Sequence, residues 1–353
     1  MQHFIDMTDF TPQWFDRFYD HAADIVAHPN AYGDKHRGKV LASLFLEPST
    51  RTNFSFQGAM LRLGGSVFGS ADGSSTSAEK GESFPDTIRT VSSYADSIVL
   101  RTPWAGSALA ATLFSTVPVI NAGDGAHLHP TQTLTDLVTI RQKRGGLDGM
   151  HIGFCGDLRY GRTVHALVEA LAHFPNIRYT FVAPDTLQVP DYLTDTLDKA
   201  GQSYQKITNL AEAIHAFDVL YMTRLQKERI SGTQDPESIT HRYVLDRDML
   251  SRAPKDCLVL HPLPRTGEIC LSIDGDPRAL YFDQVKNGMY ARMALLDMML
   301  SAPPLPAPPL PYHDFPPICR QEGCITRHVG FLPNLTAQSA KGTRCQYCSG
   351  EIR

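Results

Sequence analysis

The chain has 353 residues, too many for one ordinary hydrophobic core, which predicts two domains of about 150 residues and a small addition. Its composition, 42% hydrophobic and 20% charged, is that of a globular protein, and its net charge of −4 argues against nucleic acid or an anionic membrane as the main partner. The amino terminus lacks a basic or apolar leader, and no window reaches the roughly 18 apolar residues of a spanning helix, which predicts a cytoplasmic protein.

Apolar runs of strand length alternate with amphipathic helical patterns from residue 39 to residue 300. The runs are KVLASLFLEP (39–48), SIVLR (97–101), VPVINAG (117–123), HIGFCGD (151–157), RYTFVAP (178–184), VLYMTR (219–224) and CLVLHP (257–262). Continuous apolar strands separated by helices predict an α/β fold with two doubly wound parallel-sheet domains. In such sheets ligands bind beyond the carboxyl ends of the strands, so polar residues that directly follow a run are candidates for function.

A helical pattern from Pro130 to Arg144 ends in two glycines, and we place the first domain boundary after residue 145. The predicted segments are a first domain at 1–145, a second at 146–283, and a final helix at about 284–300 whose packing partner stays open. Eight prolines in residues 301–317 exclude a helix or a central strand and predict a semi-rigid polyproline linker. A disordered tail or a ligand for an SH3-type domain are the alternatives.

Ser49, Thr50, Arg51 and Thr52 follow the first apolar run and open a helix. Helix N-termini present unpaired N–H groups and a positive dipole end, so hydroxyls and an arginine placed there make a phosphate cradle. The alternative is a capping hydroxyl with a surface arginine.

His129 precedes a proline suited to the first helical turn, and Gln132 lies one turn further on. Imidazole and amide can therefore face one crevice, where they could polarise a carbonyl and hold its amide, although a purely structural helix start remains an alternative. After the last apolar run, the prolines around Leu263 force an extended backbone, and the carbonyls of Pro262 and Leu263 can accept from a ligand's amino group.

Arg101, Arg162 and Arg224 each lie just beyond an apolar run or within the following turn. Arginine grips carboxylate and phosphate with a bidentate fork, so these three together with Arg51 suggest two ligands with several negative charges. Taken singly, each is explained as a surface arginine. The polar, glycine-rich segment 71–84 predicts a mobile loop that carries Lys80.

These motifs together resemble the aspartate carbamoyltransferase family over about residues 1–300. The runs PSTRT and HPTQ are shared by all carbamoyltransferases, whereas TRLQKER and HPLPR point to the aspartate enzymes. Ornithine enzymes would be expected to carry HCLP and an SMG loop, and neither is present. The resemblance implies transfer of the carbamoyl group of carbamoyl phosphate to the α-amine of L-aspartate in de novo pyrimidine biosynthesis. It implies no catalytic metal and no organic cofactor.

The resemblance also implies roles for individual residues. The implied carbamoyl phosphate ligands are Ser49, Thr50, Arg51, Thr52, Arg101, His129, Gln132, Pro262 and Leu263. Of these, Arg51, Thr52, Arg101 and His129 would be catalytic. The implied aspartate ligands are Lys80, Arg162, Arg224 and Gln226. Ser77 and Lys80 would reach into a neighbouring subunit's site, which implies a homotrimer with shared active sites. Glu47 and Arg229 would be the ionic partners that hold a closed form.

Three positions depart from the family pattern. Asn53 and Gln57 stand where a basic and an acidic residue are usual, and because the change is matched we expect structural consequences only. Gly267 stands where an acid often precedes the glutamate, which leaves the interactions of its loop open. An inactive homologue that serves as a scaffold, or a carbamoyltransferase for another amino acid, are the alternative functions.

The seven cysteines fall into two groups. Cys155, Cys257 and Cys270 lie in strand-like or apolar contexts and are predicted to be buried and inert. The other four are Cys319, Cys324, Cys345 and Cys348. Two close pairs at this spacing are typical of a tetrahedral four-thiolate zinc site. A redox pair or accidental thiols are the alternatives, but the tail is too short for a thioredoxin-like unit and the predicted cytoplasmic location argues against disulfides.

Residues 318–353 also resemble the zinc domain of the aspartate carbamoyltransferase regulatory chain, which is ordinarily a separate polypeptide. The resemblance implies a natural fusion with a small zinc-ribbon-like β domain, one structural zinc per chain, and contacts between chains or between trimers. The nucleotide-binding half of that regulatory chain has no counterpart here. We therefore hypothesise that CTP and ATP exert no feedback through this module.

Overall fold

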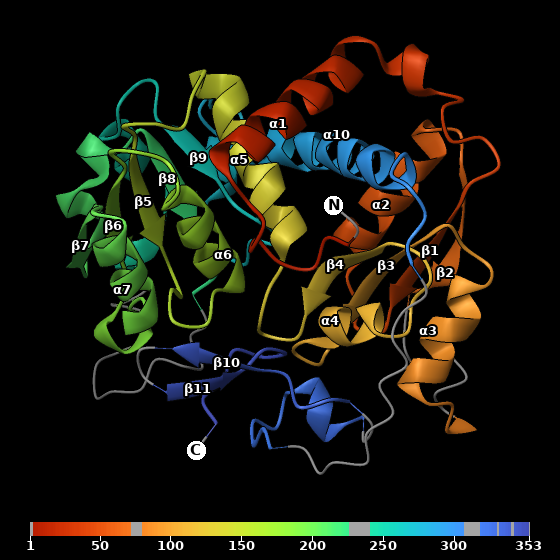
Figure 1. Cartoon of the computed structure of the whole chain (residues 1–353). Helices are drawn as coiled ribbons and strands as arrows, with labels where there is room; N and C mark the ends of the chain where they lie inside the picture. The colour runs from red at the N-terminus through yellow and green to blue at the C-terminus, as the bar shows by residue number, and fades with distance from the viewer. Residues whose placement is uncertain are drawn as a thin grey trace. The chain divides into compact units, whose positions relative to one another are not determined.

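The computed structural model describes residues 3–71, 80–225, 241–306, 318–329, 332–339 and 342–352 (Figure 1). Their contacts divide the chain into two compact units. The first unit is Met1–Asp9, Phe15–Thr131 and Met289–Arg353, and the second is Phe10–Trp14 and Gln132–Gly288. By these contacts the change from the first unit to the second falls at Thr131 and Gln132, because the helix at 130–144 bonds through its side chains to later parts of the second unit. The domain boundary after residue 145 stays a prediction.

The first unit is built on a four-stranded, fully parallel sheet in the order β2-β1-β3-β4. Its strands are β1 (Val40–Phe45), β2 (Ser66–Ser70), β3 (Ser97–Thr102) and β4 (Val119–Asp124). Its helices are most of α1 (Pro12–Ala27), α2 (Thr50–Arg62), α3 (Phe84–Ser92) and α4 (Ser107–Thr112). The strands β1, β3 and β4 come from predicted apolar runs and are almost wholly buried, whereas β2 is an exposed edge.

The second unit is built on a five-stranded parallel sheet in the order β7-β6-β5-β8-β9. Its strands are β5 (His151–Cys155), β6 (Arg178–Val182), β7 (Ser203–Ile207), β8 (Val219–Met222) and β9 (Leu258–Leu260). Its helices are most of α5 (Pro130–Arg144), α6 (Arg162–Leu171), α7 (Asp191–Lys199) and α9 (Arg247–Ser251). The last long helix, α10 (Tyr281–Leu300), begins earlier than the predicted residue 284 and contributes its first part to this unit and the rest, from Met289, to the first.

Each sheet has a topological switch point, where the chain leaves neighbouring strands in opposite directions. In the first sheet β1 leads to β2 on one side while β3 lies on the other, and in the second sheet β5 leads to β6 while β8 lies on the other side. Phe45 at the end of β1 pairs with Arg101 on β3, and Cys155 at the end of β5 pairs with Met222 on β8. In open α/β sheets these carboxyl-terminal crevices are where ligands bind.

A small region after α10, which we call the cysteine module (residues 318–352), belongs to the first unit. It contains the antiparallel pair β10 (Thr336–Ser339) and β11 (Gly342–Cys345). Short 3-10 helices complete the described structure: η1 (Pro29–Tyr32), η4 (Asp185–Leu187), η5 (Leu210–Glu212), η6 (Ile214–Ala216), η8 (His241–Tyr243), η9 (Leu271–Ile273) and η10 (Ile325–Arg327). The predicted α/β class, with two parallel sheets and a small C-terminal β region, is confirmed. No helix in the described ranges combines the length and hydropathy needed to cross a membrane.

Candidate active site and metal centre

The predicted phosphate cradle lies at the start of α2, directly after β1. Ser49 occupies the N-cap position, and its side chain does not bond to the helix's own N–H groups. Thr50 begins the helix, Arg51 is exposed and Thr52 is buried. Because the first N–H groups of a helix have no intrahelical acceptor, this end of α2 presents donors and a positive dipole beside hydroxyls and a guanidinium.

Arg101 lies at the same edge of the first sheet, because its strand runs parallel to β1. The residue is 8% exposed; its Nη1 donates to the carbonyl of Ala122 at 3.2 Å, and its Nη2 lies 3.1 Å from Oε2 of Glu47 in the loop after β1. His129 follows β4 and is 5% exposed, with Oγ1 of Thr131 3.4 Å from its Nδ1. The first unit thus places the phosphate and carbamoyl candidates at the carboxyl ends of β1, β3 and β4.

The two arginines predicted to bind carboxylates lie at the switch point of the second sheet. Arg162 begins α6 after β5, and Arg224 follows β8 with an exposed side chain. The two strand ends are held together where the N–H of Asp157 donates to the carbonyl of Arg224 at 3.2 Å. Gly156 has a φ of +130°, and a Cβ there would lie 2.3 Å from Oγ1 of Thr223, so only glycine permits this close approach.

The turn that carries Pro262 and Leu263 is held by a buried histidine and a buried glutamate. The N–H of Leu263 donates to Nδ1 of His261 at 2.7 Å, which assigns the ring proton to Nε2, 2.7 Å from Oε1 of Glu268. Burial alone would raise the pKa of Glu268, but hydrogen bonds from His261 and from the N–H of Thr266 lower it below its ordinary value. Leu263 has a φ of +53°, unusual for leucine, so the neighbours impose the backbone conformation of this turn.

Sequence reasoning missed a buried carboxylate, Asp136, that holds Gln132. Nε2 of Gln132 donates to Oδ1 of Asp136 at 2.7 Å, and Nε2 of Gln284 donates to the same oxygen at 2.6 Å. The hydroxyl of Tyr221 donates to Oδ2 at 2.9 Å. Gln284 also accepts the N–H of His261 at 3.0 Å, so one network joins Gln132 to the Pro262 turn. The available signal was the four-residue spacing on a helix, which places residues 132 and 136 on one face.

The two neutral departures from the family pattern bond to each other. Nε2 of Gln57 donates to Oδ1 of Asn53 at 2.7 Å, and the hydroxyl of Ser43 donates to the same oxygen at 2.8 Å. A matched amide pair therefore occupies these positions on α2. Gly267 is exposed with a φ of +123°, a conformation that favours glycine over the usual acid.

Some predicted residues are placed differently or not described. Ser77, Gln226 and Arg229 lie outside the described residues, as do residues 307–317 of the predicted linker. Lys80 is described and exposed. The prediction that three cysteines are buried is right for Cys155 and Cys257, whose pKa values burial raises, but wrong for Cys270, which is only half-buried. The loop that carries Cys270 follows β9 at the rim of the sheet, so its apolar sequence context overstated its burial.

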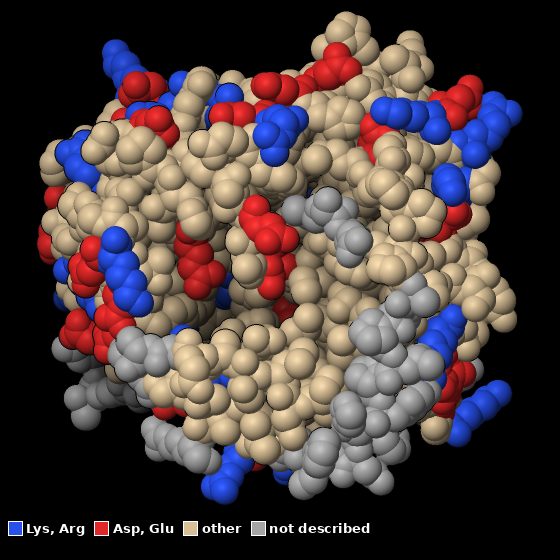
Figure 2. All heavy atoms as spheres, viewed as in Figure 1, with Lys and Arg blue, Asp and Glu red and all other residues tan. Residues whose placement is uncertain are grey.

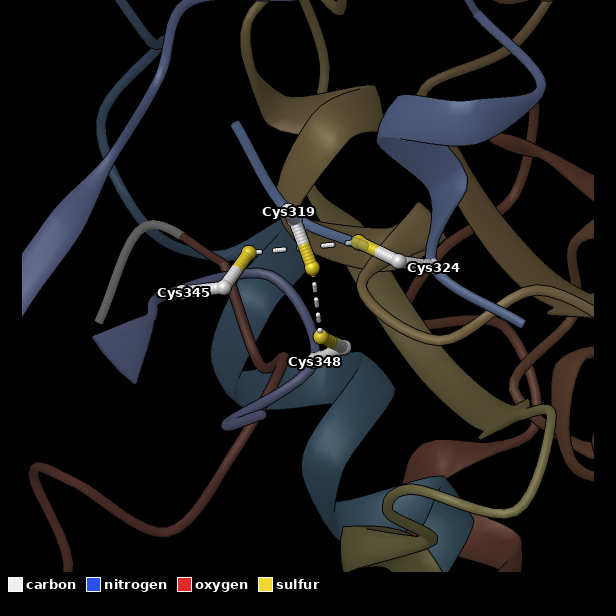
Figure 3. A group of neighbouring side chains, drawn as sticks. All are labelled: Cys319, Cys324, Cys345 and Cys348. Carbon is white, nitrogen blue, oxygen red and sulfur yellow. Dashed lines mark hydrogen bonds between the residues drawn. The ribbon is translucent and has the colours of Figure 1, made fainter. Parts of the chain in front are cut away.

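The four tail cysteines come together although 29 positions separate the first from the last. Figure 3 shows their sulfurs pointing toward a common centre, and all four Sγ atoms lie within 4.8 Å of one another. Sγ of Cys319 lies 3.6 Å from that of Cys348, and Sγ of Cys324 lies 3.9 Å from that of Cys345. A tetrahedral zinc about 2.3 Å from each sulfur would set the sulfurs about 3.8 Å apart, so the donor set fits zinc. These separations are too long for disulfides, and all seven cysteines of the chain are unpaired.

The thiols of the cluster differ in their pKa. Hydrogen bonds from Cys345 and Cys348 lower the pKa of the Cys324 thiol below its ordinary value, whereas hydrogen bonds with Cys324 raise the pKa values of Cys345 and Cys348. The turn at the second pair is closed where the N–H of Ser349 donates to the carbonyl of Cys345 at 2.9 Å. Cys319, Cys324 and Cys345 are buried and Cys348 is partly exposed, so the cluster lies beneath the surface of the module.

Charged side chains of both signs lie on the face drawn in Figure 2, where Lys and Arg are interspersed with Asp and Glu, in keeping with the net charge of −4. The arginines at the two strand-end crevices suit small anions.

Comparisons with known proteins agree with this arrangement. Residues 2–142 match the carbamoyl-P binding domain, and residues 148–299 the Asp/Orn binding domain, of the aspartate/ornithine carbamoyltransferases. The chain is 49% identical over 300 residues to an aspartate carbamoyltransferase catalytic subunit of Clostridium perfringens, covering 85% of this chain and 98% of that protein. It is 47% identical over 305 residues to that of Lachnoclostridium phytofermentans, covering 86% and 99%.

Solved structures give the same result. The catalytic subunit of M. jannaschii aspartate transcarbamoylase matches with a TM-score of 0.81 and 43% identity, over 85% of this chain and 98% of that one. The Trypanosoma cruzi aspartate transcarbamoylase in complex with carbamoyl phosphate matches with a TM-score of 0.79 and 36% identity, over 84% and 95%. The family models end at residue 299, so the cysteine module lies beyond the residues they match.

Proposed function

The chain belongs to the aspartate/ornithine carbamoyltransferase family, and from this premise we propose that it transfers the carbamoyl group of carbamoyl phosphate to the α-amine of L-aspartate. The products are N-carbamoyl-L-aspartate and phosphate, an early step of de novo pyrimidine synthesis. Both relatives compared above at 47% identity or more are named as aspartate enzymes.

The observation that carries the choice of aspartate is the pair of arginines at the second switch point. Arg162 and Arg224 follow neighbouring parallel strands, β5 and β8. Two guanidinium groups suit the two carboxylates of aspartate, whereas the cationic side chain of ornithine would be repelled. Carbamoyl phosphate is then the ligand of the first unit, where the N-terminus of α2 offers a phosphate cradle beside Arg101 and His129.

The reaction needs no covalent intermediate. The neutral α-amine attacks the carbamoyl carbon, and Thr52, Arg101 and His129 stabilise the charge that develops on the carbamoyl oxygen. The bond between the carbamoyl carbon and the phosphate oxygen then breaks, and the departing phosphate takes the proton that the amine loses. Arg51 and the N-terminus of α2 stabilise this phosphate. Both substrates are anions that repel each other in water, so holding them in place supplies much of the rate.

Within the second unit, Asp136 and Gln284 orient groups that the proposal assigns to the carbamoyl moiety. Gln132 is held by Asp136, and the turn with the Pro262 and Leu263 carbonyls is held through Gln284 and His261. Both ends of this network are fixed before any ligand arrives, which lowers the cost of ordering them on binding.

A colorimetric assay for N-carbamoyl-L-aspartate tests the proposal directly. We expect product from aspartate and carbamoyl phosphate, and none when ornithine or N-acetylornithine replaces aspartate. Product from either of those amines alone would assign the enzyme to another amino acid. Failure with all three would favour a scaffold role for an inactive homologue.

We further infer that the cysteine cluster holds one structural zinc per chain. The support is the fit of four sulfurs, 3.6 and 3.9 Å apart in pairs, to a tetrahedral ion, together with the absence of a disulfide among these four cysteines. Zinc would supply charge neutralisation and four bonds that organise a module too small for its own core. Metal analysis of the purified chain should give one zinc per chain, and a Cys348→Ser variant clearly less.

We also propose a homotrimer in which copies share active sites through Lys80 and Ser77. The support is exposed apolar surface in the first unit: Phe54 is 63% and Leu61 61% exposed, seven residues apart and hence on one face of α2. Phe68 on the edge strand β2 is also exposed. Large exposed apolar side chains that share a face mark protein contacts.

A further inference from the structure

The cysteine module shares one hydrophobic core with the first sheet. Cys319, Cys324 and Cys345 belong to the same buried cluster as Ile98 on β3 and Phe114 beyond α4. Other members from the module are Ile325, Val329, Leu332 and Tyr347. Figure 1 shows the short helix of the module, in blue, below α4. The bonds that organise the four sulfurs therefore also organise one side of the sheet's core.

The loop that follows β3 is bound to the module through its backbone. The N–H of Ala105 donates to the carbonyl of Gly323 at 2.8 Å, and the N–H of Ile325 donates back to Ala105 at 2.9 Å, on either side of Cys324. Gly106 has a φ of +82°, and a Cβ there would lie 2.4 Å from the carbonyl oxygen of Tyr347. Next to this contact, the rings of Trp104 and His328 stack with centroids 5.0 Å apart.

A buried carboxylate, Asp124, joins this loop to the loop that follows β4. Asp124 is 2% exposed; its Oδ2 accepts the N–H of Gly106 at 2.7 Å and lies 3.1 Å from Nδ1 of His127. Its Oδ1 accepts the N–H of Leu128 at 2.9 Å. The opposite ring nitrogen of His127, Nε2, lies 3.0 Å from the hydroxyl of Ser349 in the module. A continuous line of contacts thus runs from the second cysteine pair to both loops.

These two loops carry the residues assigned to the carbamoyl group. Arg101 directly precedes Thr102, whose hydroxyl donates to the carbonyl of Trp104 at 3.2 Å, and His129 directly follows Leu128. We propose that the cysteine module is a positioning element of the carbamoyl phosphate site, acting through His127 and Asp124 on the loops of Arg101 and His129. The identity of the ligand rests on the proposed function, but the coupling itself concerns any phosphate bound at this edge.

Variants that keep all four cysteines isolate the link. Ser349→Ala removes only the contact to His127, and His127→Asn retains a donor near the Nδ1 position while losing the contact to Ser349. Because each removes one hydrogen bond, we expect the Kd for inorganic phosphate to rise about fivefold in either variant, with zinc content unchanged. Gly106→Ala, which forces Tyr347 away, should weaken phosphate binding by about tenfold or more. His28→Ala is the matched control, since His28 is exposed and its ring bonds to Asp24.

The steady-state readout separates positioning from general damage. In the three link variants the KM for carbamoyl phosphate should rise, while the KM for aspartate, whose arginines lie in the second unit, stays within about twofold. Phosphate affinity that is unchanged in both Ser349→Ala and His127→Asn would overturn the proposal. Equal losses for both substrates would overturn it as well, because a structural defect does not discriminate.

Chelation tests the same coupling without substitution in the module. The chain has two tryptophans, Trp14 and Trp104, so a Trp14→Phe background leaves Trp104 as the only indole. Removing zinc should shift Trp104 emission to the red as its stack on His328 is lost, and should weaken phosphate at least as much as Ser349→Ala does. A red shift without a change in phosphate affinity contradicts the proposal. The proposal is also contradicted if the chelator changes neither the emission spectrum nor the phosphate affinity.

The outcomes also separate this inference from the proposed function. Phosphate binding that depends on the module, in a chain that forms no N-carbamoyl-L-aspartate, would remove the proposed function and leave the coupling standing. Full aspartate carbamoylation, with the same KM for carbamoyl phosphate in all link variants as in the wild type, would overturn the coupling and leave the proposed function standing.

Discussion

We propose that the side chain of Arg224 binds aspartate and does not contact carbamoyl phosphate. It is exposed after β8, and its carbonyl accepts from Asp157, so the main chain fixes its position while the guanidinium extends from the strand end. The carbamoyl phosphate candidates of the first unit lie on other elements, at the ends of β1, β3 and β4.

Replacing Arg224 with alanine should therefore raise the KM for aspartate by about 10- to 100-fold, the worth of a charge-assisted contact, and leave carbamoyl phosphate binding nearly intact. Steady-state kinetics with each substrate varied in turn would measure this. Arg252→Ala, at an exposed arginine after α9, serves as the control. Equal losses for both substrates would show that the carboxylate site is misplaced.

Asp136→Asn should weaken the binding of carbamoyl phosphate by about tenfold. The carboxylate accepts from three donors, whereas asparagine offers one oxygen and brings an NH2 group toward the others, so Gln132 loses its fixed orientation. Burial raises the pKa of Tyr221 well above its ordinary value, so its hydroxyl remains a donor and the effect should be the same at pH 7 and pH 9. Asp148→Asn, at an exposed position, is the control; a wild-type KM for carbamoyl phosphate would argue against positioning.

The difference between these two residues shows what a sequence can predict. Arg224 follows an apolar run, and because parallel strands end at one edge, its neighbourhood follows from the strand pattern. The partners of Asp136 are Tyr221 and Gln284, far along the chain, and only the folded structure brings them together. The same holds for Asp124 and Ser349, whose connection runs through His127.

Among the secondary-structure elements, buried strands are predictable and exposed edge strands are not. Each of the seven apolar runs forms a strand. By contrast β2 and β7, with the sequences SVFGS and SYQKI, are largely exposed at the edges of their sheets, where one neighbouring strand suffices and polar residues are tolerated. The final helix was predictable, but not its anchor in the first unit.

That anchor is Asp297 on α10, which is 2% exposed. Its carboxylate lies 2.7 Å from Nε2 of His21 on α1, from Nζ of Lys35 and from Nε2 of His36. Burial alone would raise the pKa of Asp297, but these hydrogen bonds outweigh burial and hold the pKa well below its usual range. The charged carboxylate therefore stabilises the folded state at any pH above the pKa that Asp297 has in the unfolded chain.

Asp297→Asn should lower the free energy of unfolding at pH 7 by about 2 to 3 kcal/mol, since it leaves buried donors facing an amide. The folded pKa is depressed, so this contribution is present above the unfolded pKa of about 4 and is lost as the pH falls below it. Urea unfolding at pH 7 and pH 3 should accordingly show a smaller gap between variant and wild type in acid. Asp34→Asn, an exposed acid paired with Arg37, is the control; a gap that widens in acid would contradict this assignment.

At the scale of the whole molecule, the apolar face of α2 bears on assembly. If Phe54 and Leu61 lie between copies, the wild-type chain should have the mass of three copies in solution. Phe54→Asp, which places a charge in that contact, should shift the mass toward one copy at micromolar concentration. Tyr94→Asp, at a residue 66% exposed outside this face, should not. Light scattering coupled to size exclusion would measure both, and a wild-type monomer would end the trimer proposal.

Sharing of sites can be tested by mixing inactive chains. His129→Ala and Lys80→Ala should each be nearly inactive alone, because each removes a different part of every site. In mixed trimers some sites combine an intact His129 with a neighbour's intact Lys80, so activity should return after subunit exchange. If the mixture stays inactive although exchange has occurred, Lys80 serves its own chain.

The hydrophobic core of the first unit is completed only by segments that the ribosome makes after the second unit. Its sheet comes from residues before Thr131, whereas Met289–Leu300 of α10 and the apolar side chains of the cysteine module follow the entire second unit. During synthesis the apolar surface around α4 therefore stays uncovered until the cysteine module has been made. Translation halted before residue 318 should leave a nascent chain with an exposed amino-terminal sheet and a strong requirement for chaperones until the cysteine module emerges.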